Sequence, residues 1–320
     1  MNRRQTIPAE LRYTFQQFDR DFPSDDACLE AIKEQRFPGG VTDCHKCEKP
    51  RKHYRVKGRT AYACETCGNH IYPLAGTIFE KSSTALRIWF HAMYLIGSTR
   101  CGISAKQIQR ETGVTYKTAW RMFHQIRKLM GEELKLGGPD GGGVEMDEMY
   151  HGGRRKDDAG RKLRGDLRKK TMVTGIVERK GRIVARVSQE LTMSAMSALV
   201  QEYVLPKSTV FTDESASYNA LPHLANAGYQ HRRINHSQKI YVAGDVHTNT
   251  IEGFWSLVKR GIGGVYHSVS AKYLQSYLDE YSFRYNRRDS GNLVFCAILQ
   301  RVSEMASHKP ASEAQKSPIS

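Results

Sequence analysis

The sequence lacks any apolar run long enough to cross a lipid bilayer. Its longest such stretch, residues 88–96, is interrupted by His91, and a membrane helix needs about 20 consecutive apolar residues. The basic residues that follow Met1 are not succeeded by an apolar segment, so the pattern of a secretory signal is also missing. These absences exclude a membrane-spanning protein, and we expect a cytoplasmic one.

Acidic residues are scarce relative to basic ones. The 320 residues include 49 lysines and arginines but 33 aspartates and glutamates, which gives a formal net charge of +16. An excess of this size attracts polyanions, so double-stranded DNA is the expected partner and a membrane is not. A basic chain that is charged only for solubility is the alternative that charge leaves open.

Composition divides the chain into several segments, which predicts a multidomain protein. The glycine-rich residues 137–143 have almost no side chains to pack and are expected to form the main domain boundary. Beyond them, short segments rich in Val, Ile, Met and Phe alternate with helical patterns, which predicts an α/β domain with a mixed sheet. The expected strands are 144–150, 171–178, 182–187 and 209–212, and the expected helices are 192–205 and 217–227. The expected domains are a lead-in with one helix over 1–40, a metal-held module over 41–75, three helices over 83–136, the α/β domain over 144–290 and a disordered tail over 307–320.

Four cysteines are spaced as zinc ligands. Cys44 and Cys47 form one C-x2-C pair, and Cys64 and Cys67 form a second pair after sixteen intervening residues. This spacing lets two tight turns place four thiolates around one structural zinc ion, so a zinc ribbon is predicted. Redox-active cysteine pairs are the weaker alternative, because no thioredoxin-like βαβ pattern surrounds them.

A helix-turn-helix pattern follows the cysteines. Ser104 to Gln107 matches a capping box, Gly113 ends that helix, and Thr115 is placed to cap the next one. We expect one face of the second helix to enter the major groove of DNA, with a solvated basic helix as the alternative. The expected core face is Tyr116, Ala119, Trp120, Phe123, Ile126 and Met130, and the expected DNA face is Lys117, Thr118, Arg121, His124, Gln125, Arg127 and Lys128.

Three carboxylates from separate segments are the candidate catalytic residues. Asp147 lies within a predicted strand, Asp213 follows another strand, and Glu252 shares a helix face with Asn249 and Lys259. Together the three carboxylates are suited to hold two Mg²⁺ (or Mn²⁺) ions about 4 Å apart for phosphoryl transfer, and Lys259 and Asn249 are suited to bind DNA beside them. Singly, each acid is equally well explained as a capping or ion-paired group. Competing acids that we rank lower are Glu145, Glu148, Glu214 and Asp245.

The segment between the first two predicted strands is strongly basic. Residues 151–170 contain nine lysines and arginines and three aspartates. Such a segment is expected to contact the phosphate backbone without reading sequence, although a solvated insertion has the same composition. The candidate contacts are Arg154, Arg155, Lys169 and Lys170.

These motifs resemble one known family. The four cysteines, Met146-Asp147-Glu148, Phe211-Thr212-Asp213, the segment His247 to Trp255 with Lys259, and Phe283 to Arg288 are similar to the ISXO-type, Merlin-related bacterial insertion-sequence transposases. The resemblance covers about residues 20–288. It implies a ribonuclease-H-like domain with an Asp-Asp-Glu triad, here Asp147, Asp213 and Glu252, together with Lys259, divalent metal and at least a homodimer on DNA.

The sequence therefore predicts a DNA transposase that binds the inverted repeats of its element, cleaves strands and joins them to a target. Two alternatives stay open. One is a transcription regulator with a zinc ribbon, a helix-turn-helix and a non-catalytic α/β domain, which has no need of the three acids. The other is a ribonuclease H or junction resolvase, which shares the chemistry but joins no new target.

Overall fold

The computed structural model describes Pro8 and residues 11–99, 101–139, 142–152, 170–179, 181–224, 227–233, 248–290 and 293–307. The chain forms two compact units, Met1–Leu129 with Asp289–Ser320, and Met130–Arg288. Within the described ranges, no helix is both long enough and apolar enough to span a membrane. Arg154, Arg155 and Lys169 of the basic segment, Asp245, and the tail beyond Ser307 lie outside these ranges, so the predictions made for them are not addressed by the structure.

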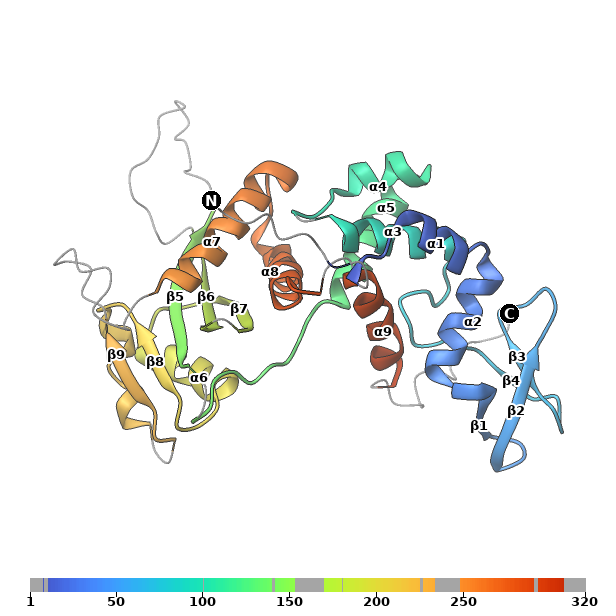
Figure 1. Ribbon diagram of the computed structural model, residues 1–320, viewed down its shortest axis with the longest axis horizontal. Helices are drawn as coiled ribbons and strands as arrows, with labels where there is room; N and C mark the ends of the chain where they lie inside the picture. Colours follow the sequence, from blue (N-terminus) through green and yellow to red (C-terminus); the bar gives the residue numbers. More distant parts are fainter. Residues whose placement is uncertain are drawn as a thin grey trace. The chain divides into compact units, whose positions relative to one another are not determined.

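The first unit combines a four-stranded antiparallel ribbon with helices (Figure 1). The strands occur in the order β1-β2-β3-β4, and His53 pairs with Cys64 across the two central strands. The elements are α1 (Phe15–Asp21), α2 (Asp25–Arg36), the 3-10 turn η2 (Pro38–Gly40), β1 (Val41–Cys44), β2 (Lys49–Arg55), β3 (Tyr62–Cys64), β4 (His70–Ile71), α3 (Leu86–Ser98), α4 (Ala105–Thr112), α5 (Tyr116–Lys128) and α9 (Val294–Ser307).

The described part of the lead-in contains two α-helices, whereas we predicted a single helix. The predicted helix is α2, and Ser24 caps it by accepting a hydrogen bond from Ala27 N. The additional helix α1 begins at a capping box, in which Thr14 and Gln17 bind each other's backbone amides. Its core contact is Phe18, which is fully buried and packs against the ring of Tyr94. The sequence contains this cap signal, but a helix of two turns has too few apolar positions to show a period.

Helix α9 at the end of the chain packs within the first unit. Phe295 is almost fully buried, and its ring lies 5.7 Å from Phe18 and 6.4 Å from Phe90, measured between centroids. Gly97 of α3 permits close approach, because a Cβ atom there would lie 2.8 Å from Phe295 N. The core of the first unit is therefore completed by a residue that comes more than two hundred positions after Phe18 and Phe90.

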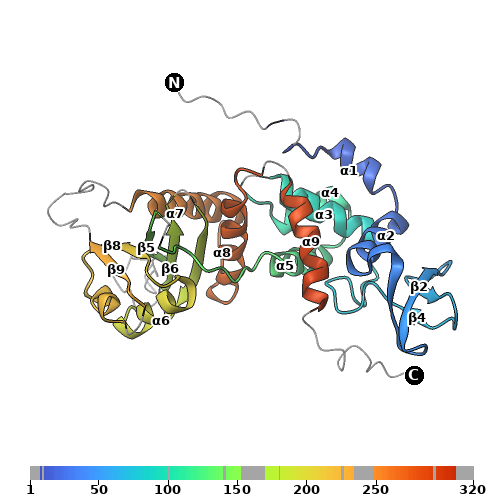
Figure 2. The ribbon, with the colours of Figure 1, turned by 60° about the horizontal axis from the view of Figure 1, so that its bottom comes forward.

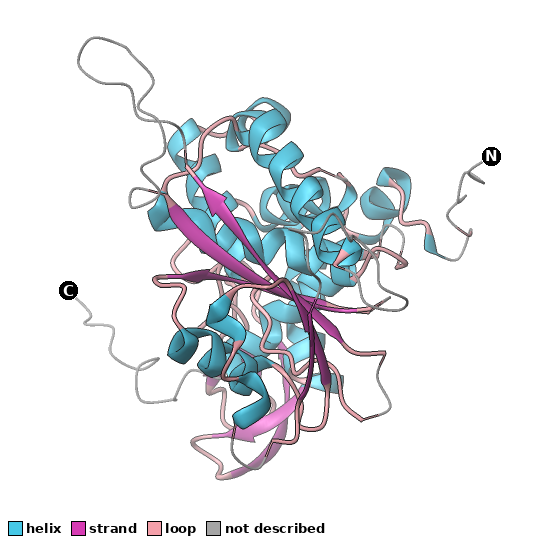
Figure 3. Ribbon diagram, turned by 90° about the vertical axis from the view of Figure 1, so that its left-hand side faces the viewer, coloured by secondary structure: helices cyan, strands magenta, loops and turns pink. Residues whose placement is uncertain are grey.

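The second unit is built on a five-stranded mixed sheet (Figure 3). The strand order is β7-β6-β5-β8-β9; β5, β6 and β7 pair antiparallel, and β8 pairs parallel with both β5 and β9. The elements are β5 (Val144–His151), β6 (Thr171–Glu178), β7 (Ile183–Ser188), α6 (Met193–Tyr203), β8 (Thr209–Thr212), the 3-10 turns η4 (Ala216–Tyr218) and η5 (Leu221–His223), β9 (Gln230–Arg233), α7 (Asn249–Gly261), the π-helical turn η6 (Ile262–Tyr266) and α8 (Ala271–Asn286).

Helices α6 and α7 cover opposite faces of this sheet (Figure 2). Val144 and Met146 of β5 share a buried apolar cluster with Met196 and Val200 of α6. Because side chains alternate along a strand, Glu145 and Asp147 point to the other face, where they contact α7. The alternation predicted from sequence thus gives β5 one apolar face and one face with acids.

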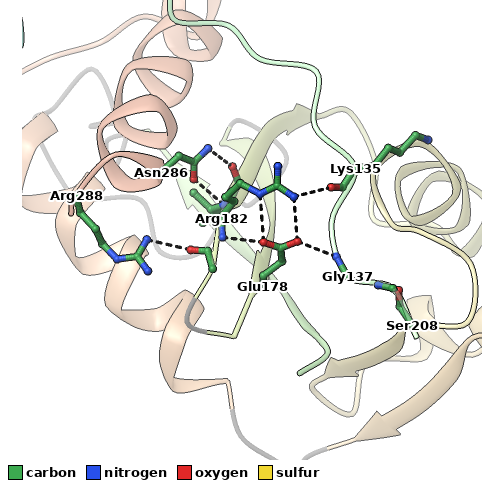
Figure 4. Close-up of polar contacts among 10 residues, drawn as sticks. Lys135, Gly137, Glu178, Arg182, Ser208, Asn286 and Arg288 are labelled. Atoms are coloured by element: carbon green, nitrogen blue, oxygen red, sulfur yellow. Dashed lines mark hydrogen bonds and ion pairs between the residues drawn. The ribbon is translucent and has the colours of Figure 1, made fainter. Parts of the chain in front are cut away.

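The glycine-rich segment is bound to the second unit and is not a free linker. Gly137 N donates to Glu178 Oε1 (3.0 Å), and Gly138 N donates to Ser208 Oγ (2.8 Å) (Figure 4). Gly137 has φ +78°, and a Cβ atom there would lie 2.5 Å from Ser208 Oγ, so the glycine serves close packing. The division between the units falls instead between Leu129 and Met130.

Three further local predictions differ from the structure. Residues 217–227 do not form the predicted helix; in the described part of that range, the turns η4 and η5 occur instead, with Pro222 inside η5. In α5, Tyr116 is 46% exposed although we assigned it to the core face. Arg127 is fully buried although we assigned it to the DNA face, and its guanidinium lies 3.6 Å from the ring centroid of Phe123.

Candidate catalytic and metal sites

The sheet brings two of the three candidate acids side by side. Glu145 pairs with Phe211 in the parallel register between β5 and β8, and continuing this register by two residues places Asp147 beside Asp213. Asp213 immediately follows the last residue of β8, at the carboxyl end of the strand. This is the position at which open α/β sheets gather ligand-binding groups.

Glu252 approaches the same region from helix α7. The negative charges of Asp213 and Glu252 both act on Asp147, and the pKa of Asp147 is raised, first by burial and then by these two charges. The described contacts of the three carboxylates are with neutral donors: Trp255 Nε1 to Asp147 (3.0 Å), Ser215 N to Asp213 (3.0 Å) and Thr248 Oγ1 to Glu252 (3.2 Å). The structure therefore concentrates negative charge at one end of the sheet, as a cation site requires.

Glycine in β6 allows α7 to lie directly on the sheet. Gly175 pairs with Asp147 on the adjacent strand, and a Cβ atom at Gly175 would lie 2.6 Å from Trp255 Cζ2 and 2.8 Å from Ile251 Cδ1. The missing side chain thus leaves room for the indole ring that donates to Asp147. The packing of α7 against the sheet and the orientation of Asp147 therefore depend on the same glycine.

We expect Gly175→Ala to destabilise the second unit by about 1–3 kcal/mol, because the new methyl group overlaps Trp255 and Ile251. Urea denaturation followed by tryptophan fluorescence measures the change. The matched control is Gly253→Ala on α7, where a Cβ atom meets nothing within 4 Å; that change removes a helix glycine and should stabilise by about 0.5–1 kcal/mol. Equal stability of the Gly175→Ala variant and the natural protein would show that α7 does not rest on this residue.

A fourth carboxylate lies on the opposite face of β5. The pKa of Glu148 is raised to about 7, mainly by burial and also by the charges of Asp213 and Asp147, although the Tyr218 hydroxyl that donates to it (2.7 Å) acts in the opposite direction. Tyr218 itself is fully buried. We ranked Glu148 below the three acids because it points to the other face of the strand. In the structure, its carboxyl group is hydrogen-bonded to the uncharged hydroxyl group of Tyr218.

The remaining catalytic-domain candidates are solvent-accessible. Asn249 is exposed at the first residue of α7, Lys259 is exposed in its last turn, and Lys170 is half-buried immediately before β6. None of the described contacts of Asp147, Asp213 or Glu252 is made by Lys259. Asn249 and Lys259 thus belong to the helix that carries Glu252, and Lys170 lies next to the strand that pairs with β5.

The four cysteines converge in the ribbon. Their sulfur atoms all lie within 4.8 Å of one another, with Cys44 Sγ 3.4 Å from Cys67 Sγ and Cys47 Sγ 3.9 Å from Cys64 Sγ. Thiolates bound at about 2.3 Å from a tetrahedral zinc ion are separated by about 3.8 Å. The donor set therefore fits one zinc ion. Among the described residues, these cysteines are the one group of three or more metal-ligating side chains this close together.

The predicted DNA face of α5 is partly exposed to solvent. Helices α4 and α5 are joined by a short turn with Gly113 at φ +72°. Lys117 and Arg121 are exposed, and Thr118 and Gln125 are half-buried. Arg121 also contacts its own unit, because its guanidinium donates to Ser82 Oγ (2.9 Å) and lies 5.6 Å from the ring centroid of Trp89.

Sequence reasoning missed the residues that support the acids. Trp255 was noted as part of a motif, and its role as donor to Asp147 depends on how α7 crosses β5. A glycine inside an apolar strand is a known signal of close approach, so Gly175 was detectable in principle. Glu145 was treated as a competing ligand, but its carboxylate accepts from Thr250 N and Ile251 N at the start of α7.

Comparison with known proteins finds transposase domains in both parts of the chain. Residues 139–286 match the ISXO2-like transposase domain, and residues 23–70 match the transposase zinc-ribbon domain. The chain is also 29% identical over 282 residues to an uncharacterized protein in transposable element ISH50 of Halobacterium salinarum, and the match covers 83% of this chain and 92% of that protein. The first match includes all three acids, and the second includes all four cysteines.

Proposed function

Since the chain belongs to the ISXO2-like transposase family, we propose that it binds the terminal inverted repeats of an insertion sequence and catalyses metal-dependent strand cleavage and strand transfer. The observation that carries this proposal is that Asp147 and Asp213 lie side by side at one end of a mixed sheet and that the negative charge of Glu252 also acts on Asp147. The strand order β7-β6-β5-β8-β9, with β8 parallel to β5, supports a ribonuclease-H-like catalytic domain. The regulator with an inactive α/β domain is not favoured, because it gives no reason for three acids from separate segments to approach one another at one end of the sheet.

The three carboxylates would hold two Mg²⁺ or Mn²⁺ ions. Carboxylate oxygens are the ligands that these hard cations prefer, and ligands shared between two ions spread more widely than the ligands of one ion. When bound, the ions supply the charge that activates the attacking oxygen and stabilises the leaving oxygen of a phosphodiester. Trp255 keeps Asp147 oriented by its indole N–H, and Thr248 does the same for Glu252.

In the proposed reaction, water first hydrolyses the phosphodiester at the end of the element and leaves a 3′-hydroxyl group. That hydroxyl then attacks a target phosphodiester, so one P–O bond forms as another breaks and the target strand leaves with its own 3′-hydroxyl. Lys259 on the exposed last turn of α7 would hold a DNA phosphate, and Asn249 would contact the strand at the first turn. Both ends of the element must be held together, so the active complex would contain at least two copies of the chain.

The first unit would hold the element ends. Its ribbon would be stabilised by one structural zinc ion at Cys44, Cys47, Cys64 and Cys67. Helices α4 and α5 would form a helix-turn-helix, with Lys117, Thr118, Arg121 and Gln125 of α5 in the major groove. Lys170 and its basic neighbours would contact the DNA backbone near the acids.

We expect Lys117→Ala to weaken binding to the element ends at every salt concentration. The plot of log affinity against log salt should become flatter by about 1, because one phosphate contact is lost. Fluorescence anisotropy with end duplexes between low and moderate salt measures both changes. The matched control is Lys272→Ala, an equally exposed lysine at the start of α8. If both variants alter the slope to the same extent, the loss reflects total charge and the proposed role of α5 is wrong.

The proposed function is tested by strand transfer with purified protein, labelled duplexes that carry the element's terminal repeats, a target plasmid and Mg²⁺. A transposase should nick the duplex at the repeat boundary and join the labelled strand to the plasmid, and Glu252→Ala should do neither while still binding the duplex. A ribonuclease H or resolvase should cleave without producing joined plasmid. Binding with no cleavage under any metal condition would instead support the regulator.

A further inference from the structure

Glu145 is a buried acid whose oxygens are occupied by helix α7. Its side chain is fully buried, Oε2 accepts from Thr250 N (2.9 Å) and Ile251 N (3.1 Å), and Oε1 accepts from Thr250 Oγ1 (2.9 Å). Glu145 belongs to β5, more than a hundred residues earlier in the chain. One carboxylate therefore fixes the first turn of α7 to the strand that carries Asp147.

Helix α7 depends on this contact because its own cap does not bind the free amides. The first amides of a helix have no partner within the helix and are usually bound by the N-cap side chain. Thr248 at the N-cap makes no such bond, and its hydroxyl donates to Glu252 instead. The Glu145 carboxylate caps the helix in place of Thr248, and its negative charge is favourable at the positive end of the helix.

Arg179 connects the Glu145 carboxylate to β8, the strand that leads to Asp213. Arg179 Nε lies 3.1 Å from Glu145 Oε1, and its guanidinium lies 3.6 Å from the ring centroid of Phe211. Phe211 pairs with Glu145 across β5 and β8, and lies two residues before Asp213. Glu145 belongs to β5 and binds α7, and Arg179 packs against β8. The pair thus joins the three elements that carry Asp147, Asp213 and Glu252, and neither residue is one of those acids.

We propose that Glu145 and Arg179 form a positioning pair that sets where Glu252 stands relative to Asp147 and Asp213. The inference rests on the proposed function, since it assigns the pair to the same metal site. Neither residue reaches substrate in this role; Glu145 acts through α7, and Arg179 acts through Glu145 and Phe211. Groups that orient metal ligands in this way typically change metal affinity or activity by about 10- to 100-fold when removed.

The test uses Glu145→Gln in the full chain, with Mn²⁺ as the probe. The amides of Thr250 and Ile251 should exchange with solvent faster in the metal-free variant, and Mn²⁺ should bind about 10- to 100-fold more weakly. In the transfer assay kcat should fall while KM for the end duplex stays constant, because the duplex is held mainly by the first unit. Thr250→Val removes a single hydrogen bond of the set and should shift the same readouts in the same direction by a smaller factor, even if Glu145→Gln folds poorly.

Glu178→Gln is the matched control. Glu178 ends β6 next to Arg179, forms its own ion pair with Arg182 (3.3 Å) and accepts from Gly137 N, but none of these contacts involves α7 (Figure 4). Its replacement should leave the exchange of the Thr250 and Ile251 amides and the Mn²⁺ affinity unchanged. Equal effects of Glu145→Gln and Glu178→Gln would reduce the pair to a general stabilising contact and overturn the proposal.

The outcomes separate this inference from the proposed function. If Asp147→Asn abolishes transfer but Glu145→Gln and Thr250→Val keep natural Mn²⁺ affinity and kcat, the positioning pair is refuted and the transposase proposal stands. If Asp147→Asn retains full transfer, the proposed site itself is wrong. Faster exchange in α7 without any change in Mn²⁺ affinity also contradicts the inference, because the helix would then move without moving the metal site.

Discussion

Replacement of Asp147 by Asn should lower strand cleavage and strand transfer on the order of 10³-fold or more, while affinity for the element ends stays unchanged. Asparagine keeps the size of the side chain and an oxygen to accept from Trp255 Nε1, but it removes a negative charge where three carboxylates gather. The loss should therefore appear in the cleavage rate and in Mn²⁺ affinity. Single-turnover cleavage of labelled end duplexes and direct Mn²⁺ titration measure the two quantities.

Asp279→Asn provides the comparison. Asp279 lies in the same unit, and burial raises its pKa as it does for Asp147, but it is ion-paired with Arg186 (3.1 Å). Its replacement should reduce stability and leave the cleavage rate of the folded protein within a few-fold of the natural rate. A similar loss of cleavage in both variants would mean that any buried aspartate of this unit is needed for folding and that Asp147 has no special place.

Loss of the zinc ligands should have the second large effect. Cys64→Ser should reduce bound zinc from one ion per chain to none, since the remaining three thiols no longer complete the tetrahedral set. Structural zinc contributes roughly 10–16 kcal/mol to the folding of small zinc-binding modules, so the ribbon should unfold and binding to element ends should be lost. Metal analysis and anisotropy with end duplexes report the two changes, and Mn²⁺ affinity should persist because the acids belong to the other compact unit.

The corresponding control is Cys101→Ser. Cys101 is exposed in the same unit and is not one of the four clustered cysteines. Its replacement should retain one zinc ion per chain and natural DNA affinity. Retention of zinc by Cys64→Ser would contradict the four-cysteine site, and retention of DNA binding after zinc is lost would remove the ribbon from the proposed DNA-binding surface.

Local signals in the sequence predicted most of the secondary structure. The strand at Thr209–Thr212 and the helix α6 after its cap Thr192 occur where the pattern indicated. Short-range spacing also predicted the cysteine cluster, because the two knuckles are local turns. The strand and helix signals lie within each element, and the two cysteine pairs are only sixteen residues apart, so the pattern itself contains them.

Long-range contacts were beyond such reasoning. The cap of α7 joins Glu145 to Thr250 and Ile251, which come 105 and 106 positions later in the chain. No periodic pattern connects residues that far apart. The burial of Arg127 follows from the neighbours that surround α5, since an isolated amphipathic pattern assigns arginine to the solvent face. For the acids, the sequence identified the residue types, whereas their approach depends on the parallel pairing of β5 with β8.

The position of α9 has a consequence for synthesis of the chain. The ring of Phe295 packs against Phe18, Phe22 and Phe90. The helices that are synthesised first therefore cannot complete their hydrophobic core until α9, the helix synthesised last, has left the ribosome. A gene copy truncated near its 3′ end would therefore yield a product damaged at its beginning, even though every codon for the ribbon and for α1 to α5 is intact.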